Sequence, residues 1–428
     1  MKVAILTMFT GLSSTYSVVN VVAEQLRMLL DAHIATKLLV SEHFSCEEKV
    51  GVFLDERIEW VKITNKRNLN IMENGKIRDG FYEEADVMAH DLVRNLSDVD
   101  VCFMHDILYL GEFLLQNVAV RTAQQQLPDV RFIAFTHSFP ATPQKTDWPF
   151  SARFTPMPNT TYVYPTASGI PALAKQYDVP EEMCQVVNNS LDFLAFCSDE
   201  VRTVAQKVDL LSPDYLVVYP ARLSSGKQLE KVASFCGAIK ELTRRNVTVL
   251  FCDFPSNETD PKSYKPLIQL TGYEAGLNVD DIVFTSDIGF EKGFPRKGVL
   301  ELFTLSNLFV FPSSSEALPL ILLEAASRGN FLVVNESVPA LEELGKKLGA
   351  YLIRWDPHNF GFHTTEFYPQ TEKVYLQEHA AKIVDRMQND SVIHAKTLVR
   401  QQFSPQWVWK NQLEPLLSPF VSTKPTNV

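Results

Sequence analysis

The sequence predicts an α/β protein made of two Rossmann-like domains, each built on a parallel sheet. Short apolar runs alternate with helical patterns along the 428 residues, which is the order of elements in α/β folds. These apolar runs are continuous, as expected for strands that are covered on both faces. The alternation begins at the N-terminus and again near residue 214, so we expect two domains of similar size.

Individual elements follow from these runs. In the first series, strands are expected at 3–8, 36–40, 99–104 and 131–136, with a helix at 18–30. In the second series, strands are expected at 215–219, 247–252, 282–285, 308–311, 331–334 and 350–353, with helices at 227–245 and 320–328. A proline and polar residues in 207–214 predict the boundary, which gives domains 1–206 and 207–402 and a tail 403–428. Ligands of such sheets bind beyond the carboxyl ends of the strands, so two domains that face each other would enclose a cleft.

Composition narrows the class of function. The net charge is −11 and no basic face is evident, which argues against nucleic-acid binding. Residues 57–78 mix cationic with anionic side chains, so we expect a solvated surface there, with contact to anionic lipid or acceptor as the alternative. The six cysteines form no C-x-x-C pair and are interpreted as buried reduced thiols. Without a signal-peptide pattern, or an apolar run near the roughly 20 residues that span a bilayer, a cytoplasmic location is expected.

A long proline-rich segment, residues 139–162, follows the strand that ends near His137. Its five prolines argue against a helix or a central strand. Long loops are usually functional or disordered, and aromatic side chains argue against disorder. We therefore expect Trp148, Phe150 and Phe154 to form part of an acceptor wall or lid, and the alternative is a loop that packs on its own domain.

The segment 301–329 carries the most informative pattern. A strand ends at Pro312, and a serine-rich turn leads to Glu316 and to a helix that carries Glu324. If this helix starts near Leu318, its free amides favour an anion such as a diphosphate. Carboxylates beside a nucleotide sugar can accept hydrogen bonds from sugar and ribose hydroxyls. Taken alone, each glutamate would be an ordinary helical charge, and the surrounding strand, turn and helix favour a binding site instead.

A second segment, residues 215–231, places two cations after a strand. Arg222 follows the strand, and Lys227 comes five residues later at the expected start of a helix. Two cations beside a helix N-terminus suit a diphosphate. The alternative is a pair of solvated surface cations.

These motifs together resemble a known family. The pattern Arg-Leu-x-x-x-Lys, followed by Pro-Ser-x-x-Glu-x-x-Pro-Leu-x-x-x-Glu-Ala, resembles the retaining family-4 glycosyltransferases of GT-B fold. The segments 99–105, 131–138, 172–192 and 403–416 also look like parts of that family, so the resemblance covers most of the chain. Two positions depart from the pattern: Gly11 alone represents the glycine-rich first loop, and Ser190 stands where glycine is usual.

The resemblance implies roles in the second domain, which would bind the nucleotide sugar. Arg222 and Lys227 would hold the donor diphosphate and stabilise its charge as it leaves. Glu316 would bond hydroxyls of the transferred sugar, and Glu324 would bond the ribose. Main-chain amides would also reach sugar or phosphate, namely those of Ala317, Leu318 and Leu320.

In the first, acceptor-side domain the resemblance implies two further contacts. His137 would lie near the sugar over the reacting face, and Gly11 would let the backbone approach the phosphates. A capping or core histidine is the alternative for His137. The strand-end residues His105 and Asp106 have no implied role. The tail 403–428 would begin with a helix that crosses back to the first domain.

The implied reaction is the transfer of a hexose from a nucleotide-diphosphate sugar, with UDP favoured and GDP possible, to a sugar, glycan or other hydroxyl acceptor. Configuration would be retained by same-face attack. No Asp-x-Asp metal motif has a convincing setting, so no metal and no cofactor are expected, and cations with a helix dipole would stabilise the leaving group. The alternatives are a sugar phosphorylase or nucleotide-sugar epimerase on the same fold, and a non-catalytic subunit that binds a nucleotide sugar.

Overall fold

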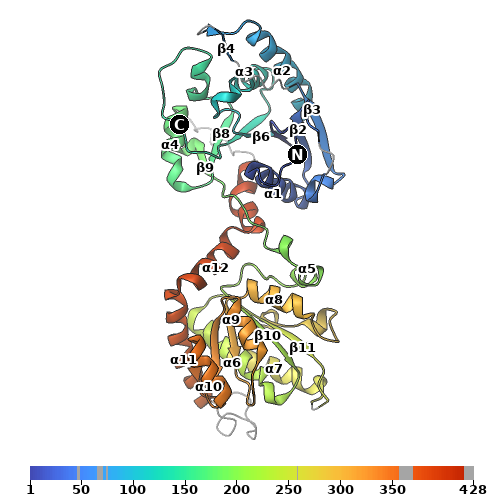
Figure 1. The fold of residues 1–428 in the computed structure, drawn as a ribbon, viewed down its shortest axis with the longest axis vertical. Helices are drawn as coiled ribbons and strands as arrows, with labels where there is room; N and C mark the ends of the chain where they lie inside the picture. The colour runs from blue at the N-terminus through green and yellow to red at the C-terminus, as the bar shows by residue number, and fades with distance from the viewer. Residues whose placement is uncertain (46–48, 65–70, 74–75, 258, 356–369, 419–428) are drawn as a thin grey trace, which may run out of the picture. The chain divides into compact units, whose positions relative to one another are not determined.

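The computed structural model describes the chain except for residues 46–48, 65–70, 74–75, 258, 356–369 and 419–428, and it divides into two compact units (Figure 1). Unit 1 comprises Met1–Leu191 together with Pro405–Val428, and unit 2 comprises Asp192–Ser404. Each unit is a Rossmann-like α/β layer structure around one parallel sheet, as predicted.

The sheet of unit 1 has seven parallel strands in the order β3-β2-β1-β6-β7-β8-β9. Their bounds are β1 Lys2–Leu6, β2 Ala35–Ser41, β3 Ile58–Ile63, β6 Val101–His105, β7 Arg131–Phe135, β8 Thr160–Tyr164 and β9 Cys184–Val186. A short antiparallel pair, β4 (Met72–Glu73) and β5 (Lys76–Ile77), stands apart from this sheet. The order of the strands reverses between β1 and β6, so the carboxyl ends of these two strands form the switch point where ligands bind in open α/β sheets.

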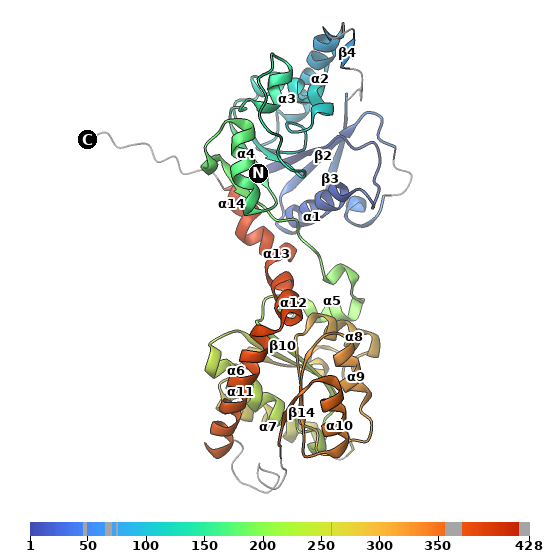
Figure 2. The same ribbon diagram turned by 60° about the vertical axis from the view of Figure 1, so that its left-hand side comes forward.

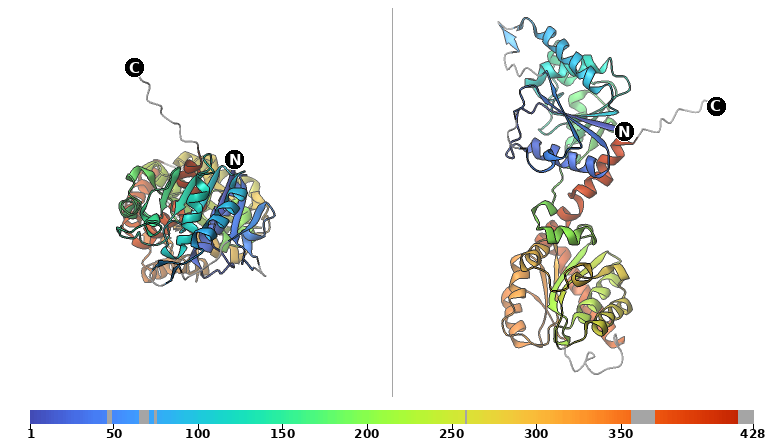
Figure 3. Two further views of the ribbon diagram at one scale, coloured as in Figure 1. Left: turned by 90° about the horizontal axis from the view of Figure 1, so that it is seen from above. Right: turned by 90° about the vertical axis from the view of Figure 1, so that its right-hand side faces the viewer.

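Helices cover both faces of this sheet (Figure 3). Alternate residues of β1 enter two separate cores: Val3 and Ile5 pack with α1 (Ser17–Asp31), whereas Ala4 and Leu6 belong to the core shared with the other helices. These are α2 Phe81–Leu96, α3 Leu114–Gln124 and α4 Ile170–Tyr177. Both faces of β1 are buried, which explains why the strand is a continuous apolar run in the sequence.

The end of the chain packs in unit 1. The last elements are α13 (Pro405–Val408), a π-helical turn at Trp409–Leu413 and α14 (Glu414–Leu417). Val408 and Leu413 are fully buried in the core beneath α1. The Arg131 guanidinium donates to the carbonyl of Leu417 at 2.7 Å, and to the next carbonyl at 3.1 Å, which anchors the end of α14 to β7.

The sheet of unit 2 has six parallel strands in the order β12-β11-β10-β13-β14-β15, with its switch point between β10 and β13. Their bounds are β10 Tyr215–Arg222, β11 Val247–Phe254, β12 Ile282–Phe284, β13 Leu308–Phe311, β14 Phe331–Asn335 and β15 Tyr351–Ile353. The helices are α5 Asp199–Ala205, α6 Leu229–Thr243, α7 Pro261–Ala275, α8 Arg296–Leu305, α9 Leu320–Ser327, α10 Pro339–Leu348, α11 Gln370–Asn389 and α12 Ser391–Gln402. Successive helices α11 and α12 run along one side of this unit (Figure 2).

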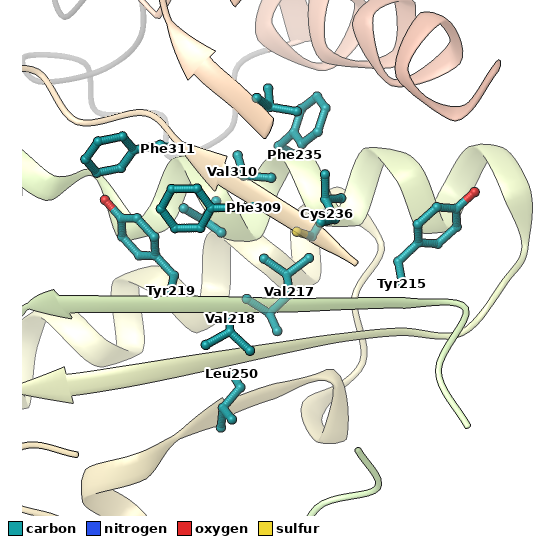
Figure 4. Close-up of a cluster of buried hydrophobic side chains, with 14 of the residues drawn as sticks. Tyr215, Val217, Val218, Tyr219, Phe235, Cys236, Leu250, Phe309, Val310 and Phe311 are labelled. Carbon is teal, nitrogen blue, oxygen red and sulfur yellow. The ribbon is translucent and has the colours of Figure 1, made fainter. Parts of the chain in front are cut away.

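Aromatic rings fill the core of unit 2 above β10. Tyr219 lies 6.0 Å from Phe309 and 6.1 Å from Phe311, measured between ring centroids, and all three lie on the same side of the strand (Figure 4). The Tyr219 hydroxyl donates to the carbonyl of Lys227 at 2.8 Å. A core side chain therefore supports the loop that follows β10.

The expected boundary at 206/207 needs correction, because unit 2 begins at Asp192. Val201 and Val204 of α5 are fully buried in the core of unit 2, so α5 is part of that unit. Residues 207–214 are also held within unit 2, where the buried Arg400 of α12 donates to the carbonyls of Leu210 and Pro213. Polar composition predicted a linker there, but the polar groups have partners in the same unit.

Two other expectations have a structural outcome. The cysteines in the described part of the chain are free thiols, four of them buried, and Cys46 lies outside that part. In the segment 57–78, Arg57 pairs with Asp55 at 2.6 Å and Arg78 pairs with Glu84 at 2.5 Å, as expected for a surface of mixed charge, and Lys66 and Arg67 lie outside the described residues.

None of the helices within the described ranges is both long and apolar enough to cross a membrane.

One buried side chain joins the carboxyl ends of three strands in unit 2. Asn335, at the end of β14, is fully buried, and its amide group donates to the carbonyls of Pro312 and Ser313 at 3.3 Å and of Trp355 at 3.1 Å. Its Oδ1 accepts from the amides of Ser337 and Trp355, each at 3.0 Å. Asn335 therefore fixes the turn that follows β13.

We predict that Asn335→Ala destabilises unit 2 by about 2–4 kcal/mol, because several buried carbonyl and amide groups lose their partner. Urea unfolding monitored on the full chain measures this loss. The matched control is Asn389→Ala, since among the described residues the exposed Asn389 amide bonds only to Asp385 of its own helix, and its cost should stay within about 0.5 kcal/mol. Equal stability of the two variants would contradict the bridging role of Asn335.

Candidate active site

The loops after β10 and β13 meet at the switch point of unit 2. The carbonyl of Gly226 accepts from the backbone amide of Ser314 at 3.0 Å and from its hydroxyl at 3.1 Å. A Cβ atom at Gly226 would have ordinary contacts only, so the glycine here is not required by crowding. These bonds join the two segments that the sequence analysis had singled out separately.

Lys227 and Glu316 form an ion pair across this junction. The Lys227 ammonium contacts Glu316 Oε1, and the Ser313 hydroxyl donates to the same oxygen at 2.8 Å. The two charged side chains are only 25% and 12% exposed, so the pair is partly shielded from solvent. The fully buried Ser313 was not predicted as a site residue, although the serine-rich turn had been noted. The site therefore holds one cation and one carboxylate at the sheet edge, and their charges balance each other.

The local structure around Lys227 differs from the expectation. Lys227 ends a 3₁₀ turn, Ser225–Lys227, and does not begin the helix. Gln228 follows with a φ of +51°, a left-handed conformation, and α6 starts after it at Leu229. The reversal at Gln228 therefore separates Lys227 from the helix, and the left-handed conformation carries a conformational cost for a residue that has a Cβ atom.

Arg222 and Glu324 come from elements of neighbouring strand–helix units, β10 and α9, and have different settings. Arg222 is the last residue of β10 and its side chain is exposed. Glu324 lies in α9, where Oε1 accepts from Arg296 Nε at 2.8 Å. Arg296 opens α8 and was missed by the sequence analysis, because nothing in its local pattern distinguishes it from other surface cations.

The helix after Glu316 begins at Leu320, as expected from the helical pattern 320–328, and not near Leu318. Pro319 occupies its N-cap and α9 starts at Leu320, because the backbone of Pro319 is extended with a ψ of 104°. The amides of Ala317, Leu318 and Leu320 make no hydrogen bond to any residue that the structure describes. These donors, with the start of an eight-residue helix, can receive an anion.

Unit 1 has a cavity of about 570 Å³ at its own switch point. Its walls are the loop 7–13 after β1, the start of α1, and residues that include His105 and Glu112. Gly11 belongs to this wall, and the position of its missing Cβ has one neighbour, a carbonyl at 3.6 Å. The structure therefore places Gly11 where a ligand can approach the backbone.

His137 is joined to His105 at the ends of β7 and β6. Nδ1 of His105 and Nε2 of His137 are 2.8 Å apart. The two ring planes are nearly parallel, with an interplanar angle of 6°, and the ring centroids are 5.1 Å apart. This distance and angle describe an edge-to-edge hydrogen bond between the rings. The backbone amide of His137 also donates to Asp106 Oδ1 at 2.8 Å.

Burial sets the protonation of this cluster. Desolvation lowers the pKa of His137, an effect that the nearby Asp106 carboxylate opposes. For His105, desolvation and the adjacent His137 both lower the pKa. The same burial raises the pKa of Asp106 against the opposing influence of His137. Both histidines are therefore neutral near pH 7.

The aromatic residues of 139–162 lie in a more structured segment than expected. Phe150 and Phe154 bound a 3₁₀ turn, and Phe150 packs against the core of unit 1. Trp148 is 49% exposed. The 570 Å³ cavity of unit 1 is lined by other residues, so the acceptor role of these three stays a prediction.

The end of this segment corrects the expectation of a loop to residue 162. Thr160–Tyr164 forms β8, a parallel strand between β7 and β9. All the prolines precede it, the last at Pro158, so the backbone amides of TTYVY remain available for the sheet. The β-branched and aromatic residues of this run were the missed signal.

A family model matches a large part of the second unit. Residues 201–353 match the family model described as Glycosyl transferases group 1. No curated protein matches the sequence. The match gives this chain a glycosyltransferase domain, and it makes the protein an enzyme of the glycosyl-transferring class.

Solved structures align along nearly the whole chain at low identity. A glycosyltransferase from Rickettsia africae has 13% identity and a TM-score of 0.35, with 97% of both chains covered. Anabaena HepE in complex with UDP has 13% identity and a TM-score of 0.34, with 97% and 100% covered. A UDP-forming trehalose-phosphate synthase from Burkholderia xenovorans has 14% identity and a TM-score of 0.37, with 98% and 99% covered. At these scores the alignments bear on neither substrate nor mechanism.

We predict that part of the stability of unit 1 is lost as the pH falls below about 6.5, the ordinary value for histidine. The pKa values of His105 and His137 are lower in the folded state, so the unfolded chain takes up protons there that the folded chain does not. Each of these two histidines lowers the free energy of unfolding by at most about 1.4 kcal/mol per pH unit of acidification. His105→Phe removes one such group.

Urea unfolding of the wild type and His105→Phe at pH 7.5 and 5.5 measures this effect. The variant should be the less stable protein at pH 7.5, and the difference should narrow at pH 5.5. Asp106, with its raised pKa, acts in the opposite sense, since its contribution is lost as the pH rises, and it is present in both proteins. His90→Phe on the exposed side of α2 is the control. If the difference in stability between the wild type and His105→Phe does not narrow from pH 7.5 to pH 5.5, the prediction is contradicted.

Proposed function

We propose that this enzyme transfers a hexose, with retention of configuration, from a nucleotide-diphosphate sugar to a hydroxyl acceptor. The observation that carries the proposal is the Lys227–Glu316 pair at the switch point of unit 2, held between two bonded loops and beside the free amides before α9. A cation for phosphate and a carboxylate for sugar hydroxyls are thereby available in one place.

Donor binding would use the pair without breaking it. A lysine ammonium has three donor hydrogens, so Lys227 can keep Glu316 as one partner and bond a phosphate oxygen with another. Arg222 would supply a second cation at the same edge, and the amides of Leu318 and Leu320 would receive the remaining charge. Glu316 would retain acceptor capacity for the sugar hydroxyls.

The nucleoside would lie toward α8 and α9. The Glu324 carboxylate has one oxygen bonded to Arg296, which holds the side chain in place while the other oxygen can accept from a ribose hydroxyl. We favour a uridine nucleotide. The resemblance of the motifs to family-4 enzymes supports this role for Glu324.

The proposed chemistry follows from where charge develops. As the sugar–phosphate bond breaks, the sugar gains oxocarbenium character and the diphosphate gains negative charge. Lys227, Arg222 and the start of α9 would stabilise that negative charge in place of a metal ion. The leaving phosphate would accept the proton of the attacking hydroxyl on the same face, which retains the configuration.

Unit 1 would supply the acceptor side and two donor contacts. Gly11 would allow the backbone to approach a phosphate, and His137 would approach the sugar. The cavity beside His105 is large enough for a sugar ring and carries the polar side chain of Glu112 in its wall. The alternative acceptor element is the loop that contains Trp148, Phe150 and Phe154.

We predict that Arg222→Ala and Lys227→Ala each lower turnover with a nucleotide sugar by roughly two orders of magnitude, because one contact to the leaving charge is worth about 3 kcal/mol. Release of nucleoside diphosphate is the assay, which also separates a transferase from a phosphorylase. Lys346→Ala is the control, since Lys346 forms a comparable ion pair with Glu342 on the exposed α10. Turnover near that of the wild type in both site variants would remove the clamp from the mechanism.

We also predict that activity survives EDTA, because protein cations and backbone amides would stabilise the diphosphate in place of a metal ion. No cluster of possible metal ligands occurs among the residues that the structure describes. The measurement is the rate of nucleoside diphosphate release before and after EDTA treatment. Loss of activity with recovery on addition of Mg²⁺ or Mn²⁺ would refute metal independence.

A further inference from the structure

The histidine pair of unit 1 has a feature that sugar binding alone does not use. His105 is 4% exposed, and its Nε2 atom is buried with no hydrogen-bond partner in the described structure. Its other nitrogen, Nδ1, is the atom bonded to His137 Nε2 at 2.8 Å. A neutral imidazole carries a hydrogen on only one of its two nitrogens, so in His105 this hydrogen lies on either Nδ1 or Nε2.

The unpartnered atom decides between the two arrangements. If His137 donated to His105, the hydrogen of His105 would lie on the buried Nε2, which has no acceptor among the residues that the structure describes. Among backbone groups, orphaned buried N–H donors are rarer than under-satisfied carbonyl acceptors, and we apply the same preference to the imidazole N–H. The favoured arrangement is therefore that His105 donates from Nδ1 and that His137 Nε2 accepts.

This arrangement fixes the hydrogen of His137. With Nε2 occupied as an acceptor, the neutral ring carries its hydrogen on Nδ1. No hydrogen bond occupies Nδ1 of His137 in the described residues, and this atom is not among the buried ones. The ring is also restrained from its backbone, since Asp106 Oδ1 accepts from the His137 amide at 2.8 Å.

The backbone of Asp106 helps to hold the two histidines next to each other. Asp106 has a φ of +58°, a left-handed conformation that is uncommon for a residue with a Cβ atom. Its own amide donates to the carbonyl of Phe135 at 2.9 Å, which ties the end of β6 to the end of β7. The strained turn thus holds both the backbone and the ring partner of His137.

We propose that His105 is a positioning residue that holds His137 as the neutral Nδ1–H tautomer, so that His137 acts on a ligand as a hydrogen-bond donor and not as a proton acceptor. The ligand atom is then an oxygen with a lone pair, such as a sugar hydroxyl or a phosphoryl oxygen. Desolvation, which lowers the pKa of both rings, keeps the pair neutral. The catalytic consequence rests on the proposed function, whereas the tautomer does not.

The test of the tautomer is a two-bond ¹H–¹⁵N spectrum of the full chain labelled with ¹⁵N-histidine at pH 7. The signals are assigned by the loss of one pattern in each of His105→Asn and His137→Asn, with the other histidines as internal references for the fold. We expect that on both rings Nδ1 carries a hydrogen and Nε2 does not. A protonated Nε2 on His137, or a doubly protonated ring, would overturn the proposal from the wild-type spectrum alone.

Two variants of His105 test the positioning role. Asparagine can place its amide where Nδ1 lies, whereas glutamine reaches toward the position of Nε2. The His137 pattern should therefore persist in His105→Asn and shift to the ordinary mixture of tautomers in His105→Gln. An unchanged His137 pattern in His105→Gln would overturn the role of His105.

The activity of the same variants separates this inference from the proposed function. With a UDP-hexose as the probe, kcat should fall about tenfold in His105→Gln, the equivalent of roughly 1.4 kcal/mol, and should be recovered in His105→Asn with the donor KM unchanged in both. Equal kcat in the two variants would contradict the positioning role. A wild type that releases no diphosphate from any nucleotide sugar would instead refute the proposed function, and the spectra would still decide the tautomer.

Discussion

The candidate donor residues of unit 2 owe their positions to one constraint, the parallel packing of strands that are buried on both faces. Parallel neighbours β10 and β13 end at the same edge of the sheet, so the loops that follow them must meet. Gly226 and Ser314 join these loops by hydrogen bonds, and Asn335 fixes the second loop from the next strand. The contact between Lys227 and Glu316, 89 residues apart in the chain, follows from this arrangement.

The two units use burial in different ways. In unit 2, the Lys227–Glu316 pair remains partly exposed, which keeps its charges available to a diphosphate and a sugar. In unit 1, His105 and His137 are desolvated, which makes them neutral and restricts them to hydrogen bonding. Stabilisation of the departing charge therefore belongs to unit 2 in the proposed mechanism, and orientation belongs to the histidine pair.

Much of the fold could be predicted, because strand burial leaves a local pattern. The strand expected at 308–311 is β13, and the strands expected from 215 and 247 begin at those residues. Errors arose where a distant partner decides the structure. Polar residues near 207 resembled a linker, but Arg400 holds them in unit 2, and Thr160–Tyr164 is a strand because β7 and β9 flank it.

The sequence by itself determined the fold class of each unit, the placement of Arg222, Glu316 and His137 at or soon after the end of a strand, and the resemblance of its motifs to a glycosyltransferase. These features depend on residues close together in the chain, where periodicity and turn chemistry act. Only the tertiary structure decided the partners: Arg296 for Glu324 and His105 for His137. The physical reason is that a hydrogen bond needs its two atoms within about 3 Å and aligned, and the packing of strands and helices sets that geometry.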